Sequence, residues 1–562
     1  MSKKAFTLAM SVAAIALLGL LVACSPSQPA AQPTAAVQKQ AQPADKAAPT
    51  SQPGSQPAAQ AQPAGQPKKG GTFRMAMLGD AIPNPFTYAG QLPTILLNKT
   101  IFSTLVRYSE KDMQPVPDLA TEWKMDEGGK SWTFKLRKDV KWHDGKPFTA
   151  ADVKFTIEGI INPKVNAQFR SNLRPVKGVD IIDDYTVRIN TTDTFPSLDI
   201  MLGYNIAIAP KHLLEGKDLN EIPEFVQNPV GTGPFKFKEY VKGDHAIVVA
   251  NDDYFLGRPY LDSVVYKVIP DINVIIAQLK TGELDSAAIE PQNMDALKGA
   301  SNVGVLSVEA PNCYYITLNA TRWPFDDKKV RQALMYGLDR KLIVEKILFN
   351  QSALATGPLA KAFGPYYNDK LQPYPYDEAK AKQLLQEAGF TPGSDGILQK
   401  DGKKLAFELL VDKGNPTREQ IILTAQQYWK KLGIDVKVVV EEWNTFIQKG
   451  STNPGNYDAR SGWRITPPDP DKESEYGTGG AVNHYMYSNP EADKLLADGK
   501  KEMDKQKRIE IYHKFQEVAY EDVPVIWIYY PNDLIALNSR VQDFPKIGIR
   551  DALVYLHKVW IK

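Results

Sequence analysis

The sequence predicts an α/β protein with two or three domains. Its 562 residues are too many for a single hydrophobic core. Segments with the apolar spacing of a helix alternate with segments in which every second residue is apolar, and this order is typical of α/β domains. The charged fraction of 23% and the formal net charge of +2 are ordinary, so the composition gives no reason to expect nucleic acid as a partner.

The first 23 residues have the composition of an export signal. Lys3 and Lys4 supply a positive start, and residues 6–22 form an apolar run. This run is too short and wrongly flanked for a membrane span. We therefore expect residues 1–23 to be removed during export.

Residues 21–24, with the sequence LVAC, resemble a bacterial lipobox. The resemblance implies cleavage before Cys24 and attachment of lipid to its sulfur. An ordinary signal peptide that is cleaved after an alanine is the alternative. Several acyl chains on one cysteine would anchor the protein firmly, because a single chain binds membranes only marginally. The second cysteine, Cys313, serves a different purpose, so we expect no disulfide.

A tether follows the lipobox. Residues 24–69 are mostly Gln, Pro, Ala and Ser, with almost no large apolar side chains. Such a segment buries too little surface to offset the entropy lost on ordering, so it is predicted to be disordered. Its prolines keep it partly extended, as expected for a linker between a lipid and a folded domain.

Residues 131–155 give the clearest local prediction. Apolar and polar side chains alternate over residues 131–136, as in a strand with one buried face. Residues 143–145, His-Asp-Gly, predict a tight turn. Thr149 and Asp152 then predict a capped helix start.

The remaining elements follow from the same spacing and capping rules. In chain order we expect strands at 72–77, 185–189, 235–240, 263–269, 314–319, 434–440 and 525–530, and helices at 98–108, 273–280, from Asp326 or Asp327, from Asp377, at 418–432, and at 490–520 with a break near Gly499.

Motifs of known catalytic or metal chemistry are missing from the sequence. The six histidines have neither zinc-protease nor zinc-finger spacing, and no nucleophile elbow or dinucleotide-binding glycine motif occurs. Paired carboxylates are abundant, so a cleft hydrolase stays open as an alternative. His143 is either a ligand or a turn histidine held by backbone hydrogen bonds, and the absence of nearby partners favours the turn.

Six segments of the chain are similar to the peptide/nickel-type extracellular solute-binding proteins of bacterial ABC importers. They lie at residues 117–123, 131–155, 228–237, 257–262, 279–285 and 442–470. In the third segment Gly231 and Gly233 flank Thr232; an anion-binding nest and a turn that leads into a strand are both open, and the missing Gly-Lys-Ser/Thr favours the turn.

The resemblance implies the fold and its division. It implies an α/β, two-lobed periplasmic-binding-protein clamshell of type II-like architecture, with an extra subdomain, mixed sheets and a hinge between the lobes. The implied boundaries are 70–115, 226–310 and 521–562 for the first lobe, 116–225 for the subdomain and 311–520 for the second lobe.

The segment 442–470 carries the implied ligand site. Trp443 and Trp463 match two pocket tryptophans of oligopeptide-binding relatives, and Arg460 falls where some relatives place an arginine that meets a peptide carboxylate. A guanidinium matches two carboxylate oxygens, and tryptophans supply flat apolar walls for peptide side chains or sugar rings.

This segment also departs from the family pattern. Three positions after the Gly-Trp tryptophan, peptide-binding relatives carry an aspartate that grips the ligand's amino end, whereas this chain has Thr466. Asp469, three residues later, is a candidate turn acid. Arg464 adds a positive group that is suited to an anionic ligand, or else it is a solvated surface arginine.

The resemblance implies a lipid-anchored, extracytoplasmic substrate-binding protein of an ABC importer. It would capture a peptide or another organic solute, such as an oligosaccharide, between its lobes and deliver it to a membrane permease. We expect a monomer without cofactor, metal or enzymatic activity. The alternatives are a ligand sensor that signals through a receptor, and the cleft hydrolase mentioned above.

Overall fold

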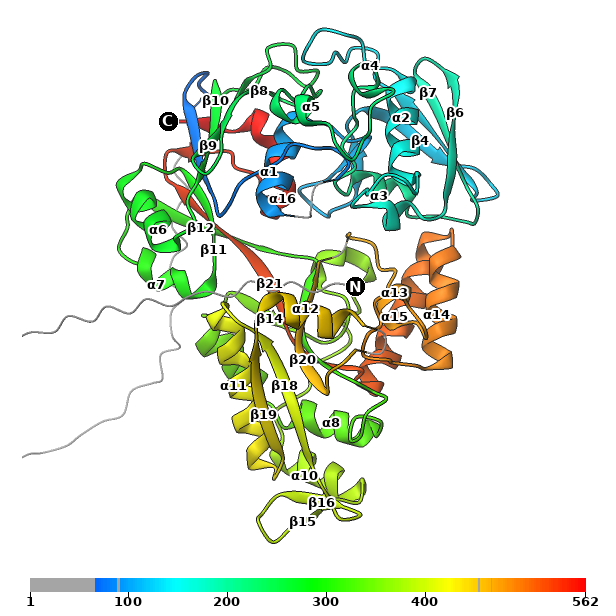
Figure 1. Cartoon of the computed structure of the whole chain (residues 1–562), viewed down its shortest axis with the longest axis vertical. Helices are drawn as coiled ribbons and strands as arrows, with labels where there is room; N and C mark the ends of the chain where they lie inside the picture. Colours follow the sequence, from blue (N-terminus) through cyan, green and yellow to red (C-terminus); the bar gives the residue numbers. More distant parts are fainter. Residues whose placement is uncertain (1–65, 88–90, 453–454, 466) are drawn as a thin grey trace, which may run out of the picture. The chain divides into compact units, whose positions relative to one another are not determined.

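The computed structural model describes residues 66–87, 91–452, 455–465 and 467–562. They belong to one compact unit, Ala64–Lys562. The predicted signal peptide, the lipidation site Cys24, most of the predicted tether and Thr466 lie outside the described residues. Within the described part, a twelve-stranded mixed sheet connects two large hydrophobic cores (Figure 1).

The large sheet combines strands from the whole length of the described chain. Its strands are β1 (Thr72–Met77), β8 (Phe235–Val241), β9 (His245–Ala250), β10 (Ser263–Val268), β11 (Ser286–Ile289), β12 (Val303–Glu309), β13 (Asn312–Leu318), β14 (Ser352–Leu354), β18 (Ala406–Asp412), β19 (Asp435–Glu441), β20 (Ala459–Ile465) and β21 (Val525–Asn538). Their order is β19-β18-β20-β13-β21-β11-β1-β10-β9-β8, with β12 and β14 also paired to β21.

β21 is shared by both cores. The first part of this 14-residue strand pairs with β13 and β14, and the second part pairs with β11 and β12. Ile535 is buried in the core that contains residues 73–266, which we call the first core. Val525, Trp527 and Ile528 are buried in the core formed by residues 313–530, which we call the second core. The change from one core to the other therefore falls inside a continuous hydrogen-bonded strand (Figure 1).

The first core is built from residues 73–266 and from the C-terminal segment. Its further elements are α1 (Leu92–Ile101), β2 (Val106–Tyr108), β3 (Pro115–Pro117), β4 (Ala120–Met125), β5 (Ser131–Leu136), α2 (Ala150–Ile161), η1 (Arg170–Leu173), β6 (Val176–Asp183), β7 (Thr186–Thr191), α3 (Leu198–Gly203), α4 (Lys211–Leu214), α5 (Pro223–Gln227), α16 (Ile549–Ala552), η5 (Leu553–Lys558), β22 (Val541–Gln542) and β23 (Trp560–Ile561). A separate antiparallel sheet has the order β4-β5-β7-β6. A smaller cluster packs α6 (Ile272–Thr281), η2 (Pro291–Asn293) and α7 (Met294–Leu297) beside β11.

The predicted strand, turn and capped helix at residues 131–155 are confirmed. β5 buries Trp132, Phe134 and Leu136 on one face. The Asp152 carboxylate accepts the Thr149 N–H at 2.9 Å, so a helix-start donor that has no intrahelical partner is satisfied at the start of α2. Two residues thus fix the beginning of this helix from the local sequence alone.

The helix predicted at residues 98–108 is wrong at its C-terminal half. α1 ends at Ile101, and residues 106–108 form β2. The Ile101 carbonyl accepts the Gly233 N–H at 2.8 Å, and the Thr104 N–H donates to the buried Asp118 carboxylate at 3.0 Å. Partners distant in sequence therefore satisfy backbone groups that a longer helix would have used internally.

The second core is built from residues 313–530. Its helices and small strands are α8 (Lys328–Tyr336), α9 (Arg340–Leu342), η3 (Ile343–Ile347), η4 (Lys361–Tyr366), α10 (Glu378–Glu387), β15 (Thr391–Pro392), β16 (Leu398–Lys400), β17 (Lys403–Lys404), α11 (Pro416–Lys431), α12 (Trp443–Ser451), α13 (Glu473–Tyr476), α14 (Pro490–Lys501) and α15 (Lys505–Asp522). The expected break lies between α14 and α15, just after Gly499, where Asp504 caps α15 by accepting the Lys507 N–H at 2.9 Å.

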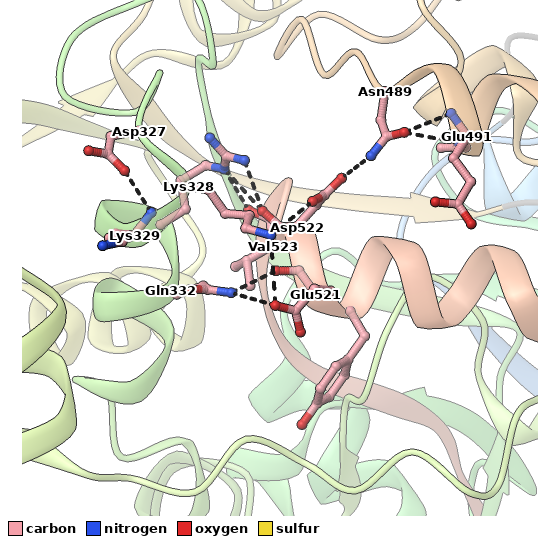
Figure 2. A network of polar contacts seen from close by, with 12 residues as sticks. Asp327, Lys328, Lys329, Gln332, Asn489, Glu491, Glu521, Asp522 and Val523 are labelled. Atoms are coloured by element: carbon pink, nitrogen blue, oxygen red, sulfur yellow. Dashed lines mark hydrogen bonds and ion pairs between the residues drawn. The ribbon is translucent and has the colours of Figure 1, made fainter. Parts of the chain in front are cut away.

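A polar network fixes the point where α15 ends and β21 begins. Figure 2 shows Gln332 directed at Glu521, and Asn489 directed at Asp522. Val523 then takes a left-handed conformation, with φ of 46°. The buried Arg331 guanidinium donates to the carbonyls of Asp522 and Val523 at 2.9 and 3.1 Å, so the last carbonyls of α15 gain both partners and positive charge.

The glycine loop before β8 is a turn held by His143. The Gly231 N–H donates to His143 Nδ1 at 3.2 Å, and Nε2 lies 3.0 Å from the Gly233 carbonyl oxygen. A Cβ on Gly231 would lie 1.9 Å from the Ile101 carbonyl oxygen, so only glycine fits there. Because the N–H groups of both glycines have protein partners, the loop is a turn and offers no anion nest.

The contacts of His143 predict acid lability. Desolvation lowers the pKa of His143 to about 4, while the unfolded chain keeps the ordinary value of 6.5. Between these pH values the unfolded state binds the extra proton, so the stability contributed by His143 is lost as the pH falls from 6.5 towards 4. We expect His143→Gln to unfold more easily at pH 7, by about 1–3 kcal/mol, because partnered backbone groups lose their partner.

Denaturant unfolding at several pH values measures this effect. The variant should also show a shallower decrease of the unfolding free energy between pH 6.5 and 4 than the natural protein. The pKa of His557 is also lowered by burial to about 4, but this histidine is present in both proteins and cancels in the comparison. If the unfolding free energies of the two proteins change in parallel with pH, His143 is not the neutral side chain that holds this loop.

Candidate functional site

A large cavity in the described residues is lined by elements of both cores. Its volume is about 800 Å³, within the range of ligand pockets. We call it the main cavity. One wall comes from the first core and consists of Ile95, Gln168, Phe169, Ser171, Asn172, Arg174, Pro175, Phe195, Met201, Tyr204 and Arg550. The other wall comes from the second-core part of the chain and consists of Arg464, Pro467, Asp469, Asp471, Glu473, Ser474, Glu475, Thr478, Gly479, Gly480, Ala481, Val482 and Lys500.

A smaller cavity of about 320 Å³ continues along the strands that connect the cores. It shares Tyr204 and Arg550 with the main cavity. Its lining includes residues 308–312, where β12 passes into β13, and Asp533 of β21. The smaller cavity therefore links the main cavity to the strands that connect the two cores.

The charges on the second-core wall are mostly paired with one another. Arg464 lies 3.2 Å from Glu475, and Lys500 is paired with Glu473. Asp469 is paired with the buried Arg508 at 2.9 Å. This leaves Asp471, whose pKa is raised by burial and whose carboxylate accepts the Glu473 N–H at 2.9 Å. This wall thus offers little uncompensated charge to a ligand.

Two residues of the predicted site segment take defined positions here. Arg464 lines the main cavity and is neutralised by Glu475, so it is neither a fully solvated surface arginine nor an unpaired cation. Asp469 accepts the Asp471 N–H at 3.0 Å in addition to its pair with Arg508. Those contacts are what a turn-stabilising acid makes.

The two predicted pocket tryptophans lie together. The rings of Trp443 and Trp463 are 5.9 Å apart, and Trp443 is 47% exposed. The Arg418 guanidinium lies 4.0 Å from the centre of the Trp463 ring and pairs with Asp412 at 3.0 Å. We call these four side chains the aromatic cluster.

The aromatic cluster forms where two parallel strands end. β18 ends at Asp412 and leads to α11, and β19 ends at Glu441 and leads to α12, which starts with Trp443. The carboxyl ends of parallel strands are the usual ligand-binding edge of open α/β sheets. Neither tryptophan is among the described residues that line the main cavity.

Arg460 is packed against aromatic rings. Its guanidinium lies 4.0 Å from the centre of the Phe446 ring, and burial lowers its pKa. A Cβ on Gly450 would overlap an Arg460 nitrogen, so α12 covers the side chain closely. Arg460 and Arg464 therefore have different partners, Phe446 and Glu475.

Sequence patterns missed five residues that the structure brings to these two sites. Arg418 and Asp412 support Trp463, and Asn172, Arg174 and Arg550 line the main cavity. The one local signal is Asn415, which caps α11 through a 2.9 Å hydrogen bond and thereby sets the position of Arg418. The cavity residues lie in turns and short helices without periodicity.

The described part of the chain contains no cluster of three or more His, Cys, Asp or Glu side chains arranged to hold a metal ion. None of its helices combines the length and the apolar character needed to cross a bilayer.

Comparison with protein families identifies one match over most of the chain. The model described as "Bacterial extracellular solute-binding proteins, family 5 Middle" matches residues 114–484. The oligopeptide-binding protein AppA of Bacillus subtilis is 33% identical, over 88% of this chain and 92% of that protein. The heme-binding protein A of Haemophilus influenzae is 31% identical, over 80% and 84%.

Solved structures show the same architecture. AppA of Bacillus subtilis in complex with a nonapeptide has a TM-score of 0.74 at 32% identity, covering 88% of this chain and all of that chain (100%). NikZ of Campylobacter jejuni in complex with Ni(L-His) has a TM-score of 0.74 at 29% identity, covering 87% and 99%. The predicted fold class, a two-lobed α/β clamshell with mixed sheets, is confirmed by these neighbours.

Proposed function

The chain belongs to the bacterial extracellular solute-binding proteins of family 5, as its sequence motifs predicted, and on this premise we propose that it is the substrate-binding component of an ABC importer. We propose a peptide as the solute. The main cavity, which both cores line, is the observation that carries this proposal. The similarity to an oligopeptide-binding protein over nearly the whole described chain favours a peptide over an oligosaccharide.

Ligand capture would proceed by closure of the two lobes. β21 and the β12–β13 connection cross between them, so bending in these strands would change the width of the cavity. A ligand that touches both walls binds the closed arrangement more tightly than the open one and so shifts the equilibrium towards closure. The closed form would then dock on a membrane permease, through a surface of the polar kind usual for transient contacts.

The aromatic cluster is proposed to receive apolar parts of the ligand. Trp443, Arg460, Trp463, Arg464 and Thr466 stay our proposed ligand contacts. The exposed Trp443 ring, stacked beside Trp463, provides a flat apolar surface at the ligand-binding edge of the sheet. Thr466 carries no charge, so the ligand's amino end would lack the usual acidic partner at this position.

Attachment to the membrane is proposed to occur through lipid on Cys24. The protein would then act outside the cytoplasm, with residues 24–69 as its tether. A tether raises the local concentration of the binding protein near its permease. The lobe boundaries at residues 225/226, 310/311 and 520/521 belong to the same proposal.

A thermal-shift screen tests the proposed ligand class. We expect an equimolar pool of random pentapeptides to raise the unfolding midpoint and maltooligosaccharides to leave it unchanged. Ligand at a hundredfold excess over Kd stabilises the folded state by about 2.7 kcal/mol. N-acetylated pentapeptides should stabilise the protein as well as free ones, because Thr466 cannot pair with an ammonium. If only sugars stabilise the protein, the proposed ligand is a sugar and not a peptide. If only peptides with a free amino end stabilise it, the proposed role of Thr466 is wrong.

The aromatic cluster is tested by Trp443→Ala. We expect peptide affinity in calorimetric titration to fall by about threefold to tenfold, since one aromatic contact contributes about 0.5–1.5 kcal/mol. Tyr376→Ala, which removes another exposed ring of the second core outside the cluster, serves as the matched control and should bind normally. Equal affinities of both variants would remove Trp443 from the site.

The anchor is tested by Cys24→Ser. We expect the natural protein in the membrane fraction of bacterial cells, with a fatty-acid label, and the variant in the released fraction without label. A variant that still sediments with membranes would show that something other than lipid on this cysteine holds the protein there.

A further inference from the structure

The segment 168–174 presents a row of hydrogen-bond donors to the main cavity. Gln168, Ser171, Asn172 and Arg174 line this cavity directly. Arg170 lines an adjoining hollow of about 420 Å³, which shares Gln168, Ser171 and Arg174 with the main cavity. We call residues 168–174 the donor segment.

Two buried donors of this segment have no partner in the described part of the chain. Asn172 Nδ2 and Arg170 Nη2 are buried, and neither has a hydrogen-bond partner among the described residues. Arg170 Nε donates to the Ile160 carbonyl at 3.2 Å, which holds the guanidinium in place. Buried donors without acceptors are rare because each one costs free energy. An acceptor group that is part of a ligand would satisfy them.

The charge of the two cavity walls differs in sign. The first-core wall contributes Arg174 and Arg550 and, among its described residues, no acidic side chain. Neither arginine side chain forms an ion pair or a hydrogen bond within the described part of the chain. The acids that line the cavity all belong to the opposite wall, where the pairs with Arg464, Lys500 and Arg508 neutralise three of the four. Arg550 acts on the Asp533 carboxylate, which lines the smaller cavity, so its charge is partly balanced. Uncompensated positive charge on the first-core wall therefore belongs mainly to Arg174.

Arg174 also approaches a cation of the other wall. Lys500 of α14, which feels the charge of Arg174, is paired with Glu473, and that pair and the nearby Asp471 raise its pKa despite Arg174. A guanidinium matches a carboxylate with two parallel hydrogen bonds.

We propose that the donor segment, together with Arg550, is a subsite for an anionic group of the ligand, so that the protein selects peptides with acidic side chains. This inference rests on the proposed peptide-binding function. The carboxylate would accept hydrogen bonds from Asn172 and Arg174 on the first-core wall.

Mass spectrometry of retained peptides tests the subsite. The natural full-length protein is incubated with an equimolar pool of random pentapeptides, washed, and its bound peptides are sequenced. We expect enrichment of Asp and Glu, and about tenfold tighter binding of a retained acidic peptide than of its amide counterpart, as for one charge-assisted hydrogen bond. Arg174→Gln should abolish this preference. Arg188→Gln, an exposed arginine of β7, is the matched control and should keep it.

A small probe separates the subsite from the peptide proposal. Glutarate should raise the unfolding midpoint of the natural protein more than glutaramide does, and this difference should disappear in Arg174→Gln. If peptides are retained without acidic enrichment, or if Arg174→Gln keeps the enrichment, the subsite is wrong while peptide binding stands. If no peptide is retained, peptide binding is wrong, and the glutarate experiment alone decides about the subsite. A glutarate-induced rise of the unfolding midpoint that is lost in Arg174→Gln supports the subsite. No rise, or an equal rise in the natural protein and the variant, overturns it.

Discussion

The pairing of β21 with neighbours in both cores is the constraint on which the rest of the structure depends. Its first part is hydrogen-bonded to β13 and its second part to β11 and β12. The strand is also fixed at both ends, by the Arg331 contacts at the end of α15 and by Arg540, which pairs with the fully buried Asp285. Since both ends are held, the proposed lobe closure would be absorbed between them, around Pro531, whose carbonyl accepts the Ala310 N–H at 3.2 Å.

Elements set by local contacts could be predicted from the sequence. Asp327 and Asp377 cap α8 and α10 through hydrogen bonds of 2.8 Å to N–H groups two and three residues later. Such signals are contained in a few consecutive residues and need no knowledge of the fold. The end of α1 could not be predicted, because Gly233 and Asp118 supply its decisive contacts from elsewhere in the chain. A helical apolar pattern gives no information about such distant partners.

In the candidate site, too, some features could be predicted from local sequence and others depend on distant partners. Trp443 follows the end of β19, and Trp463 lies in β20. Both could be recognised by their motif, and their rings lie together. The partners of the arginines could not be foreseen, since Phe446 and Glu475 reach Arg460 and Arg464 from α12 and α13. The donor segment carries neither periodicity nor a motif. Its significance appears only when the chain brings it to the main cavity and leaves buried donors without acceptors.

The pairing of charges on one wall decides where ligand specificity can arise. A charge that already has a protein partner gains little from a ligand, because binding must first replace that partner or desolvate the pair. On the second-core wall this applies to Arg464, Lys500 and Asp469. Discrimination by charge therefore falls to the first-core wall, where Arg174 and Arg550 stand without acids among the described lining residues. On the second-core side, the exposed surface proposed to receive apolar parts of the ligand is the aromatic cluster, whose tryptophans are not among the described residues that line the main cavity.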